Sequence, residues 1–213
     1  MEKVDLLKYE HELYEQGYNL IAGCDEAGRG PLCGPVVAAA VILPKNYKLE
    51  GLNDSKQLSE KKRDKFFEII KKDAISYGIS IIDAKTIDEV NIYEASRMAM
   101  KKAIDNMAIK PDYILTDAMP ITDLDVPVKA IIHGDGLSLT IAAASVLAKV
   151  TRDHYMYELD KKYPKYEFRK HKGYPTKRHL ELISQYGVTK DYRFTYKPVK
   201  NVVESRNLNE DEK

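Results

Sequence analysis

The sequence predicts an α/β fold in which a mixed five-stranded sheet is flanked by helices, with a small helical part towards the C-terminus. Five short apolar stretches have the length and composition of buried strands, and amphipathic helical patterns lie between several of them. About six turn residues separate the first two strands, which predicts that these two run antiparallel. A chain of 213 residues can bury the core of one large domain with a small addition.

The first elements follow from capping signals and apolar runs. Residues 3–16 predict a short amphipathic helix that ends before Gly17, and residues 20–24 predict the first strand. Residues 36–43 are almost wholly apolar, which is typical of a strand covered on both faces. The N-terminal part of the chain is therefore expected to form a helix and a hairpin.

The middle of the chain predicts helices and one more strand. Ser59 is expected to cap a helix, and residues 75–82 alternate as a third strand does. Thr86 and Asn91 each begin a capping-box pattern, and the second is expected to open a long helix. The apolar face of that helix is expected to include Met98.

Two further strands and two helices complete the prediction. Residues 112–117 and 128–132 read as the fourth and fifth strands. Ser138 is expected to cap a long helix, and Thr176 to cap the last one. Residues 201–213 are polar and are expected to form a flexible tail.

Positive charge is concentrated near the C-terminal end. The net charge of the whole chain is +1, but residues 161–200 hold twelve Lys or Arg against three acids. Six tyrosines are interleaved there: Tyr163, Tyr166, Tyr174, Tyr186, Tyr192 and Tyr196. This pattern is typical of a polyanion-binding surface, although a solvated helical face explains it equally well. We therefore expect a main domain over 1–160 and a basic helical segment over 161–200 that contacts nucleic acid.

Composition limits the class of protein. The apolar runs are shorter than the roughly 20 residues of a membrane span, and the charged N-terminus does not predict a secretory signal. A cytoplasmic, monomeric protein is the expectation. Cys24 and Cys33 sit beside apolar residues and are interpreted as small buried side chains rather than redox or zinc residues.

Acidic residues follow three of the predicted strands. Asp25 and Glu26 end the first, Asp117 ends the fourth, and Asp135 follows the fifth. Sites in α/β proteins form outside the carboxyl ends of strands, so these side chains are expected to converge. Close carboxylates repel one another unless cations neutralise them, and oxygen ligands favour Mg²⁺ or Mn²⁺. The sequence therefore predicts a divalent metal site.

Three patterns in the chain require interpretation. Consecutive strand residues point to opposite faces, so Asp25 and Glu26 share one site only if the strand bends or the main chain of Glu26 supplies a ligand. The glycines of 28–34 come near a dinucleotide-binding pattern, but the third glycine is displaced and prolines interrupt the helix which that motif needs. Residues 142–145 form a small-residue helix face that is interpreted as helix–sheet packing.

Five blocks of sequence, within a stretch from about residue 19 to 199, resemble the type 2 ribonucleases H, also called ribonuclease HII. These blocks are GCDEAGRGPLCGPVVAAAVILP, NDSKQLSEKKR, TDA at 116–118, GDGLSLTIAAASVLAKVTRD and YPKYEFRKHKGYPTKRH. Arg29 stands where the related type 3 enzymes have lysine, which favours type 2.

The resemblance implies an RNase H-like fold and a function. Members cut the RNA strand of RNA–DNA hybrids, and cut 5′ of single ribonucleotides embedded in DNA, leaving 3′-hydroxyl and 5′-phosphate ends. The implied cofactors are two divalent cations, Mg²⁺ or Mn²⁺. The implied partner is an RNA–DNA hybrid or a DNA with embedded ribonucleotides.

The resemblance also implies roles for individual residues. The catalytic and metal-binding carboxylates are Asp25, Glu26, Asp117 and Asp135. Asp25 is expected to bind both ions, with Glu26 and Asp117 on one of them and Asp135 on the other. The backbone that reads the RNA-to-DNA junction is Gly28, Arg29 and Gly30. Tyr174 is implied to stack on the deoxyribose 3′ of the ribonucleotide, and the residues near the nucleic-acid backbone are Lys56, Ser145 and Lys149.

Three positions depart from the family pattern: Tyr192 replaces a histidine, His133 a lysine, and Pro175 a glycine. Two other functions remain open on the residues alone. One is a different two-metal nuclease or resolvase on the same fold, which would prefer branched junctions to an embedded ribonucleotide. The other is a non-catalytic nucleic-acid-binding module, which would not require the four carboxylates.

Overall fold

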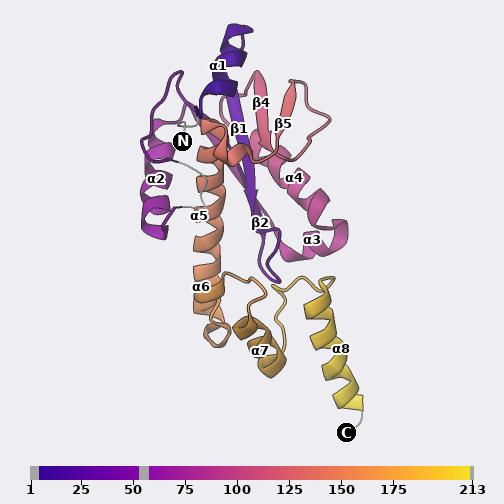
Figure 1. Ribbon diagram of the computed structural model, residues 1–213. Coiled ribbons are helices and arrows are strands. Elements are labelled where there is room, and N and C mark those ends of the chain that lie inside the picture. The colour runs from indigo at the N-terminus through magenta and orange to yellow at the C-terminus, as the bar shows by residue number, and fades with distance from the viewer. Residues whose placement is uncertain (1–4, 53–57, 212–213) are drawn as a thin grey trace. The chain divides into compact units, whose positions relative to one another are not determined.

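The computed structural model describes residues 5–52 and 58–211 of the chain. The chain divides into two compact units, which are described separately (Figure 1). Neither unit is one continuous stretch: the first comprises Met1–Ala27, Val37–Ile81 and Ser96–Val150, and the second comprises Gly28–Val36, Ile82–Ala95 and Thr151–Lys213. This division differs from the expected boundary at residue 160, because the second unit takes three segments from different parts of the chain.

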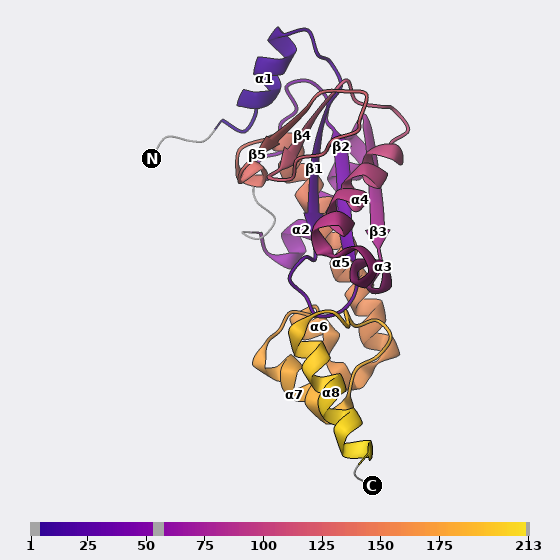
Figure 2. The same ribbon diagram turned by 90° about the vertical axis from the view of Figure 1, so that its right-hand side faces the viewer.

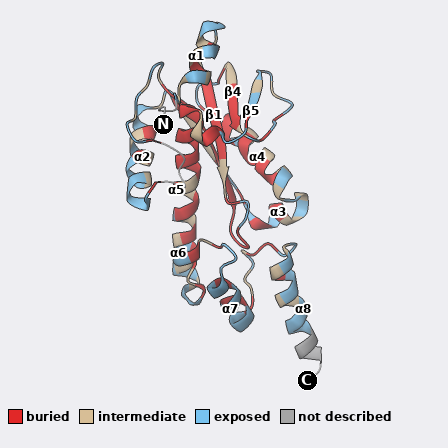
Figure 3. Ribbon diagram, viewed as in Figure 1, coloured by how far each residue is buried: buried red, intermediate tan, exposed pale blue. Residues whose placement is uncertain are grey.

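The first unit is built on a five-stranded mixed sheet, as the sequence predicts. The strand order is β3-β2-β1-β4-β5, where β1 pairs with β2 in antiparallel orientation and β4 pairs with β1 and β5 in parallel orientation. The strands are β1 (Ile21–Ala27), β2 (Val36–Ile42), β3 (Ser76–Ile82), β4 (Tyr113–Asp117) and β5 (Val128–Ile131). All residues of β2 are buried, which confirms the prediction of a strand covered on both faces (Figure 3).

Two helices lie against opposite faces of this sheet (Figures 1 and 2). The backbone of α5 (Leu139–Lys162) approaches β1 so closely that a Cβ atom on Gly23 would overlap the backbone of Thr140. On the other face, α4 (Ile92–Asp105) approaches β3 at Gly78, where a Cβ atom would overlap the carbonyl oxygen of Ala103. The small residues 142–144 of α5 are fully buried in the core, which confirms their packing role.

A buried glutamate joins the N-terminal helix to α5. Glu10 lies on α1 (Lys8–Glu15) and is fully buried. Its Oε1 atom accepts hydrogen bonds from Ser138 Oγ at 2.7 Å, from Thr140 Oγ1 at 2.8 Å and from the Thr140 N–H at 3.0 Å. A carboxylate at a helix N-terminus satisfies N–H groups that have no partner within the helix. The sequence analysis did not identify this role.

The remaining helices begin mostly where capping residues predict. Ser59 caps α2 (Glu60–Asp73), and Thr176 caps α7 (Lys177–Tyr186). Asn91 accepts hydrogen bonds from the N–H groups of Tyr93 and Glu94 at the start of α4. The short elements are α3 (Ala84–Val90), α6 (Phe168–His171), and the 3₁₀ turns η2 (Gly134–Gly136) and η3 (Pro164–Tyr166).

Three local predictions are wrong. Asp83, rather than Thr86, caps α3 by accepting the Thr86 N–H. Met98 is 42% exposed, because the buried face of α4 is centred one residue further on, at Ala99 and Met100. Residues 201–211, expected to be a flexible tail, continue helix α8 (Lys197–Asp211).

The helix at 201–211 is stabilised by contacts with the rest of the second unit, which the polar composition of these residues does not indicate. Val199 is fully buried, and Val202 packs against the apolar cluster of the second unit. The Arg206 guanidinium donates hydrogen bonds to the carbonyl oxygens of Ser184 and Gln185 at the end of α7. These contacts attach one side of α8 to the rest of the unit, whereas its exposed side remains polar.

Both cysteines are free thiols in the protein interior, as the sequence predicts. Cys24 and Cys33 are fully buried. Burial raises the pKa of Cys24 well above its usual range and that of Cys33 to about 12. Thiols of this kind are unreactive at neutral pH because the nucleophile is the thiolate.

No helix among the described residues is both long and apolar enough to span a membrane.

Candidate active site

The register of the parallel strands places two carboxylates side by side. Cys24 on β1 pairs with Thr116 on β4, and the next residue along each strand is Asp25 and Asp117, respectively. Neighbouring parallel strands keep equivalent residues on the same face of the sheet. The two acids therefore emerge from the same edge and the same face, as the sequence predicts.

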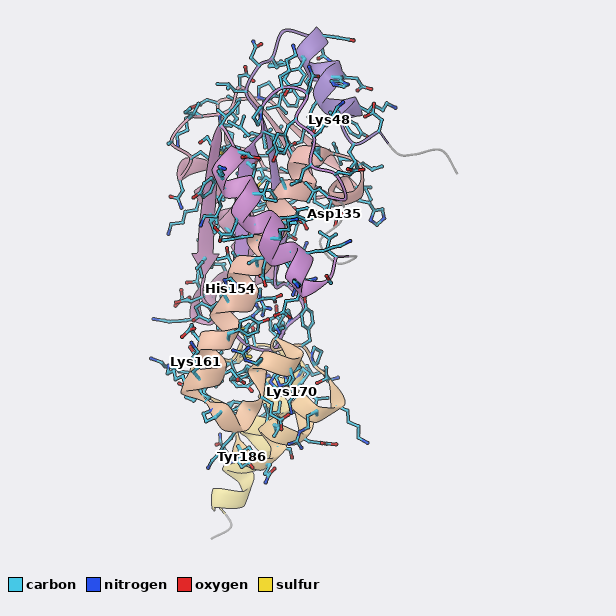
Figure 4. The ribbon with its side chains drawn as sticks, turned by 90° about the vertical axis from the view of Figure 1, so that its left-hand side faces the viewer. Lys48, Asp135, His154, Lys161, Lys170 and Tyr186 are labelled. Carbon is cyan, nitrogen blue, oxygen red and sulfur yellow. The ribbon has the colours of Figure 1, made fainter. Side chains whose placement is uncertain are left out.

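A tight turn adds the third carboxylate. After β5 the chain reverses at His133, whose φ of +58° lies in the left-handed region, and enters η2, which contains Asp135. The Gly134 N–H donates a hydrogen bond to Asp117 Oδ1 at 2.8 Å, which ties the turn to β4. One carboxylate oxygen each from Asp25, Asp117 and Asp135 lies within 4.8 Å of the others (Asp135 is labelled in Figure 4).

Glu26 differs from these three residues. β1 keeps its regular pairing with β2 through Ala27, so the side chains of Asp25 and Glu26 point to opposite faces of the sheet. The Glu26 carboxylate is accordingly outside the group of converging oxygens, while its N–H donates to Asp25 Oδ1 at 2.7 Å. The expected convergence of four carboxylates is thus seen for three.

The electrostatics of this group suit a divalent cation. Asp25 is 5% exposed, and burial raises its pKa well above the usual range. The negative charges of Glu26, Asp117 and Asp135 raise that pKa further. A hard divalent cation removes this repulsion and accepts carboxylate oxygens as ligands. The three aspartates therefore fit a Mg²⁺ or Mn²⁺ ion, and they are the residues that would hold it.

The glycine-containing loop after β1 belongs to the second unit. Gly28 is buried and has a φ of +102°, whereas Arg29 and Gly30 form an exposed tip. A Cβ atom on Gly28 would overlap the Arg152 side chain. Arg152 is itself fully buried, and its guanidinium donates to the carbonyl oxygens of Pro35, Lys172 and Cys33 at 3.0, 3.0 and 3.3 Å.

The second unit also brings Tyr174 to this loop. A Cβ atom on Gly30 would lie 3.6 Å from Cε1 of Tyr174, which is ordinary van der Waals contact. The Tyr174 ring is 41% exposed, and its centroid lies 5.9 Å from Cζ of Arg152. An exposed aromatic ring beside an exposed glycine backbone offers a flat surface and hydrogen-bonding groups in one place.

Two buried histidines hold the backbone of Tyr174. His171 Nδ1 accepts the Gly173 N–H at 3.1 Å, and His179 Nδ1 donates to the Tyr174 carbonyl oxygen at 2.9 Å. The two imidazole rings stack with centroids 4.0 Å apart. His179 Nε2 lies 2.8 Å from the hydroxyl of Tyr192, which donates to it. Each ring therefore has one defined neutral tautomer.

His179 is expected to remain neutral to unusually low pH. Burial, and then the charge of nearby His171, lowers its pKa to about 4. Neutral His179 therefore stabilises the folded state above its unfolded pKa of about 6.5, and this contribution is lost as the pH falls towards 4. An NMR titration of the imidazole carbon-bound protons should show His179 titrating near pH 4. Titration of His179 near pH 6.5 would contradict this structure of the site.

The sequence predicts three further residues near the nucleic-acid backbone. Ser145 is buried and Lys149 half-buried on the part of α5 that belongs to the first unit. Their proposed contact with the nucleic-acid backbone stays a prediction. Lys56 lies outside the described residues.

The acids of the basic segment all pair with its own lysines and arginines. Glu167 accepts hydrogen bonds from Arg178 at 2.6 Å and Lys170 at 2.8 Å, which lowers its pKa to about 2. Glu181 pairs with Arg178 and Asp191 with Lys162. The segment has twelve Lys or Arg against these three acids and so keeps a surplus of positive charge. Many of its basic side chains are exposed, among them Lys161 and Lys170 (labelled in Figure 4). This surface remains available for a polyanion.

Comparisons with known proteins agree with this arrangement. A family model described as "Ribonuclease HII" matches residues 22–199. The ribonuclease HII of Geobacillus sp. (strain WCH70) is 52% identical over 202 residues, covering 95% of this chain and 73% of that protein. The ribonuclease HII of Clostridioides difficile (strain 630) is 53% identical over 195 residues, covering 92% and 76%. The crystal structure of ribonuclease H2 from Pyrococcus horikoshii OT3 superposes with a TM-score of 0.75 at 28% identity, covering 88% of this chain and 98% of that one.

Proposed function

The chain belongs to the ribonuclease HII family and is an endonuclease for the RNA strand of RNA–DNA hybrids; from this premise we propose that it also cuts 5′ of single ribonucleotides embedded in DNA. The proposed products carry a 3′-hydroxyl and a 5′-phosphate. The observation that carries the proposal is the convergence of Asp25, Asp117 and Asp135 within 4.8 Å.

We propose that the family's dependence on divalent metal is met here by two ions, Mg²⁺ or Mn²⁺. Such ions activate the attacking water and neutralise charge on the leaving 3′ oxygen. Asp25 is the proposed ligand of both, because the charges of Asp117 and Asp135 both act on it. Asp117 serves one ion and Asp135 the other. Glu26 adds negative charge beside Asp25, which favours a cation there.

The selection of RNA requires a contact with the 2′-hydroxyl, which DNA lacks. We assign this contact to the backbone of Gly28, Arg29 and Gly30, of which Arg29 and Gly30 are exposed. Tyr174, which lies beside Gly30, offers a ring that packs flat against a neighbouring deoxyribose and leaves no room for a second 2′-hydroxyl. The basic surface of residues 161–200 contributes contacts to phosphates.

Cleavage of a DNA duplex that contains one ribonucleotide tests the proposal. With Mg²⁺ or Mn²⁺ present, we expect one cut on the 5′ side of the ribonucleotide, with a 3′-hydroxyl on the upstream product. The matched duplex with a deoxyribonucleotide at that position should stay intact, and a full RNA–DNA hybrid serves as the positive control. If the enzyme cuts the hybrid and leaves the single-ribonucleotide duplex intact, the extension to embedded ribonucleotides is wrong.

A further inference from the structure

A second buried arginine contacts the same glycine-containing loop from within. Arg193 is fully buried, and its Nη2 atom donates to the carbonyl oxygen of Gly28 at 2.6 Å. Its Nη1 atom donates to the carbonyl oxygen of Arg29 at 2.9 Å. Nε and Nη2 donate to the carbonyl oxygen of Gly34 at 3.1 and 3.0 Å. One guanidinium thus binds three carbonyl oxygens within seven residues of chain.

Tyr196 completes this contact. Its hydroxyl accepts a hydrogen bond from Arg193 Nη1 at 3.0 Å and donates one to the Arg29 carbonyl oxygen at 3.0 Å. Burial of a charged side chain is unfavourable unless its hydrogen-bonding capacity is used. The hydrogen bonds of Arg193 go to uncharged oxygens, most of them on the loop backbone. The arrangement therefore orients the loop, and an apolar side chain of the same size would not do so.

The orientation of the carbonyl groups determines what the loop presents outward. The peptides of this loop are trans, and in a trans peptide the C=O and N–H bonds point in opposite directions. The C=O groups of Gly28 and Arg29 point inward to Arg193, so the N–H groups of Arg29 and Gly30 point away from it. Both of these residues are exposed. The loop consequently directs two successive N–H donors away from Arg193, at two exposed residues of which Gly30 lies beside Tyr174.

We infer that Arg193, with Tyr196, is a positioning residue that determines the enzyme's discrimination between RNA and DNA. This inference rests on the proposed role of the Gly28–Gly30 backbone as the reader of the 2′-hydroxyl. Arg193 touches no substrate in this role. It fixes the direction of two N–H groups, which then bind an oxygen acceptor on the ribonucleotide without having to reorient. Lysine cannot replace it, because one ammonium group cannot bind three carbonyl oxygens in a plane.

The test compares KM for a single-ribonucleotide duplex with Ki for an all-DNA duplex of the same sequence, which competes without being cut. Both constants are independent of the fraction of active enzyme, so partial unfolding does not change them. With Mg²⁺ present, Arg193→Lys is expected to raise KM about ten-fold and to change Ki less than about two-fold. Arg206→Lys is the matched control, since Arg206 also binds backbone carbonyls in the second unit but does so at α7. It should leave the ratio of KM to Ki unchanged.

Tyr196→Phe keeps the test decisive if Arg193→Lys does not fold. It removes only the hydroxyl that joins Arg193 to the Arg29 carbonyl, and should shift the ratio in the same direction by a smaller factor. If Arg193→Lys folds and its ratio of KM to Ki is unchanged, the inference is wrong, while the proposed function stands. If Arg193→Lys does not fold, an unchanged ratio in Tyr196→Phe has the same meaning. If the wild-type enzyme fails to cut the single-ribonucleotide duplex, the proposed function fails and the inference falls with it.

Discussion

Asp25→Asn is expected to abolish cleavage and, in the absence of metal, to make the protein more stable. Asp25 is one of the three converging carboxylates and is the proposed ligand of both cations. Removal of one preorganised electrostatic group typically lowers a rate by about 10²–10³-fold, and a shared ligand is expected to cost at least as much. The measurement is the rate of cleavage of an RNA–DNA hybrid at saturating Mg²⁺.

The gain in stability follows from the pKa of Asp25. Burial and the neighbouring charges raise this pKa in the folded state, so folding favours the protonated form. The resulting stabilisation is fully present below the unfolded pKa of about 3.9 and is lost as the pH rises through the folded pKa. Asparagine is neutral at every pH and avoids this loss. For a chain of this size, each kcal/mol gained raises Tm by about 2–4 °C.

Two comparisons separate this effect from a general effect of charge removal. Asp125→Asn removes an exposed carboxylate from the same unit and should change neither cleavage nor Tm appreciably. Added Mg²⁺ should raise the Tm of the wild-type protein more at pH 8 than at pH 5, and should raise that of Asp25→Asn much less. Full activity of the Asp25→Asn variant would show that Asp25 is not a metal ligand. Equal Tm values for this variant and the wild-type protein without metal would show that burial and the neighbouring charges do not destabilise ionised Asp25.

Gly28→Ala is expected to lower both stability and activity, whereas Gly30→Ala should spare stability. The φ of +102° at Gly28 disfavours any side chain, and the added Cβ would overlap Arg152. Such strain costs about 1–3 kcal/mol before the overlap is counted. A displacement of the loop by roughly 1 Å is expected to lower the rate of cleavage by about 100-fold.

Gly30 provides the matched control within the same loop. Its added Cβ would make only ordinary contact with the Tyr174 ring, 3.6 Å away. Thermal unfolding should therefore differ between the two variants, and a loss of cleavage in Gly30→Ala at unchanged Tm would report contact with substrate. Wild-type stability and cleavage in Gly28→Ala would show that the left-handed conformation at this position is dispensable.

Much of the fold and the centre of the site could be predicted from the sequence, because both depend on local signals. Apolar runs identified all five strands of the described sheet, and the short link between β1 and β2 predicted their antiparallel pairing. The acids were predicted to converge because the carboxyl ends of parallel strands share one edge. The alternation of side chains along β1 also identified the difficulty at Glu26, whose carboxylate indeed lies outside the group.

Other features depend on tertiary contacts that no local pattern reveals. Arginine is mostly exposed in proteins, so nothing in the sequence marks Arg152 and Arg193 as fully buried. Arg152 lies inside one of the five blocks that resemble a known family, whereas Arg193 lies outside all of them. Similarly, the helix at 201–211 is attached through Val202 and Arg206, two contacts that its polar composition conceals. The burial of Glu10 depends on a partner 128 residues away in the chain.

The division of the second unit into three separate segments determines the order in which the protein is completed during synthesis. All three converging aspartates lie within the first 135 residues. The loop at 28–30 emerges from the ribosome early, but Arg152 is translated more than 100 residues later and Arg193 later still. A nascent chain therefore contains every residue of its metal group before the loop acquires internal support. In these terms, the three aspartates are synthesised before the two buried arginines that support the proposed reader of the ribonucleotide.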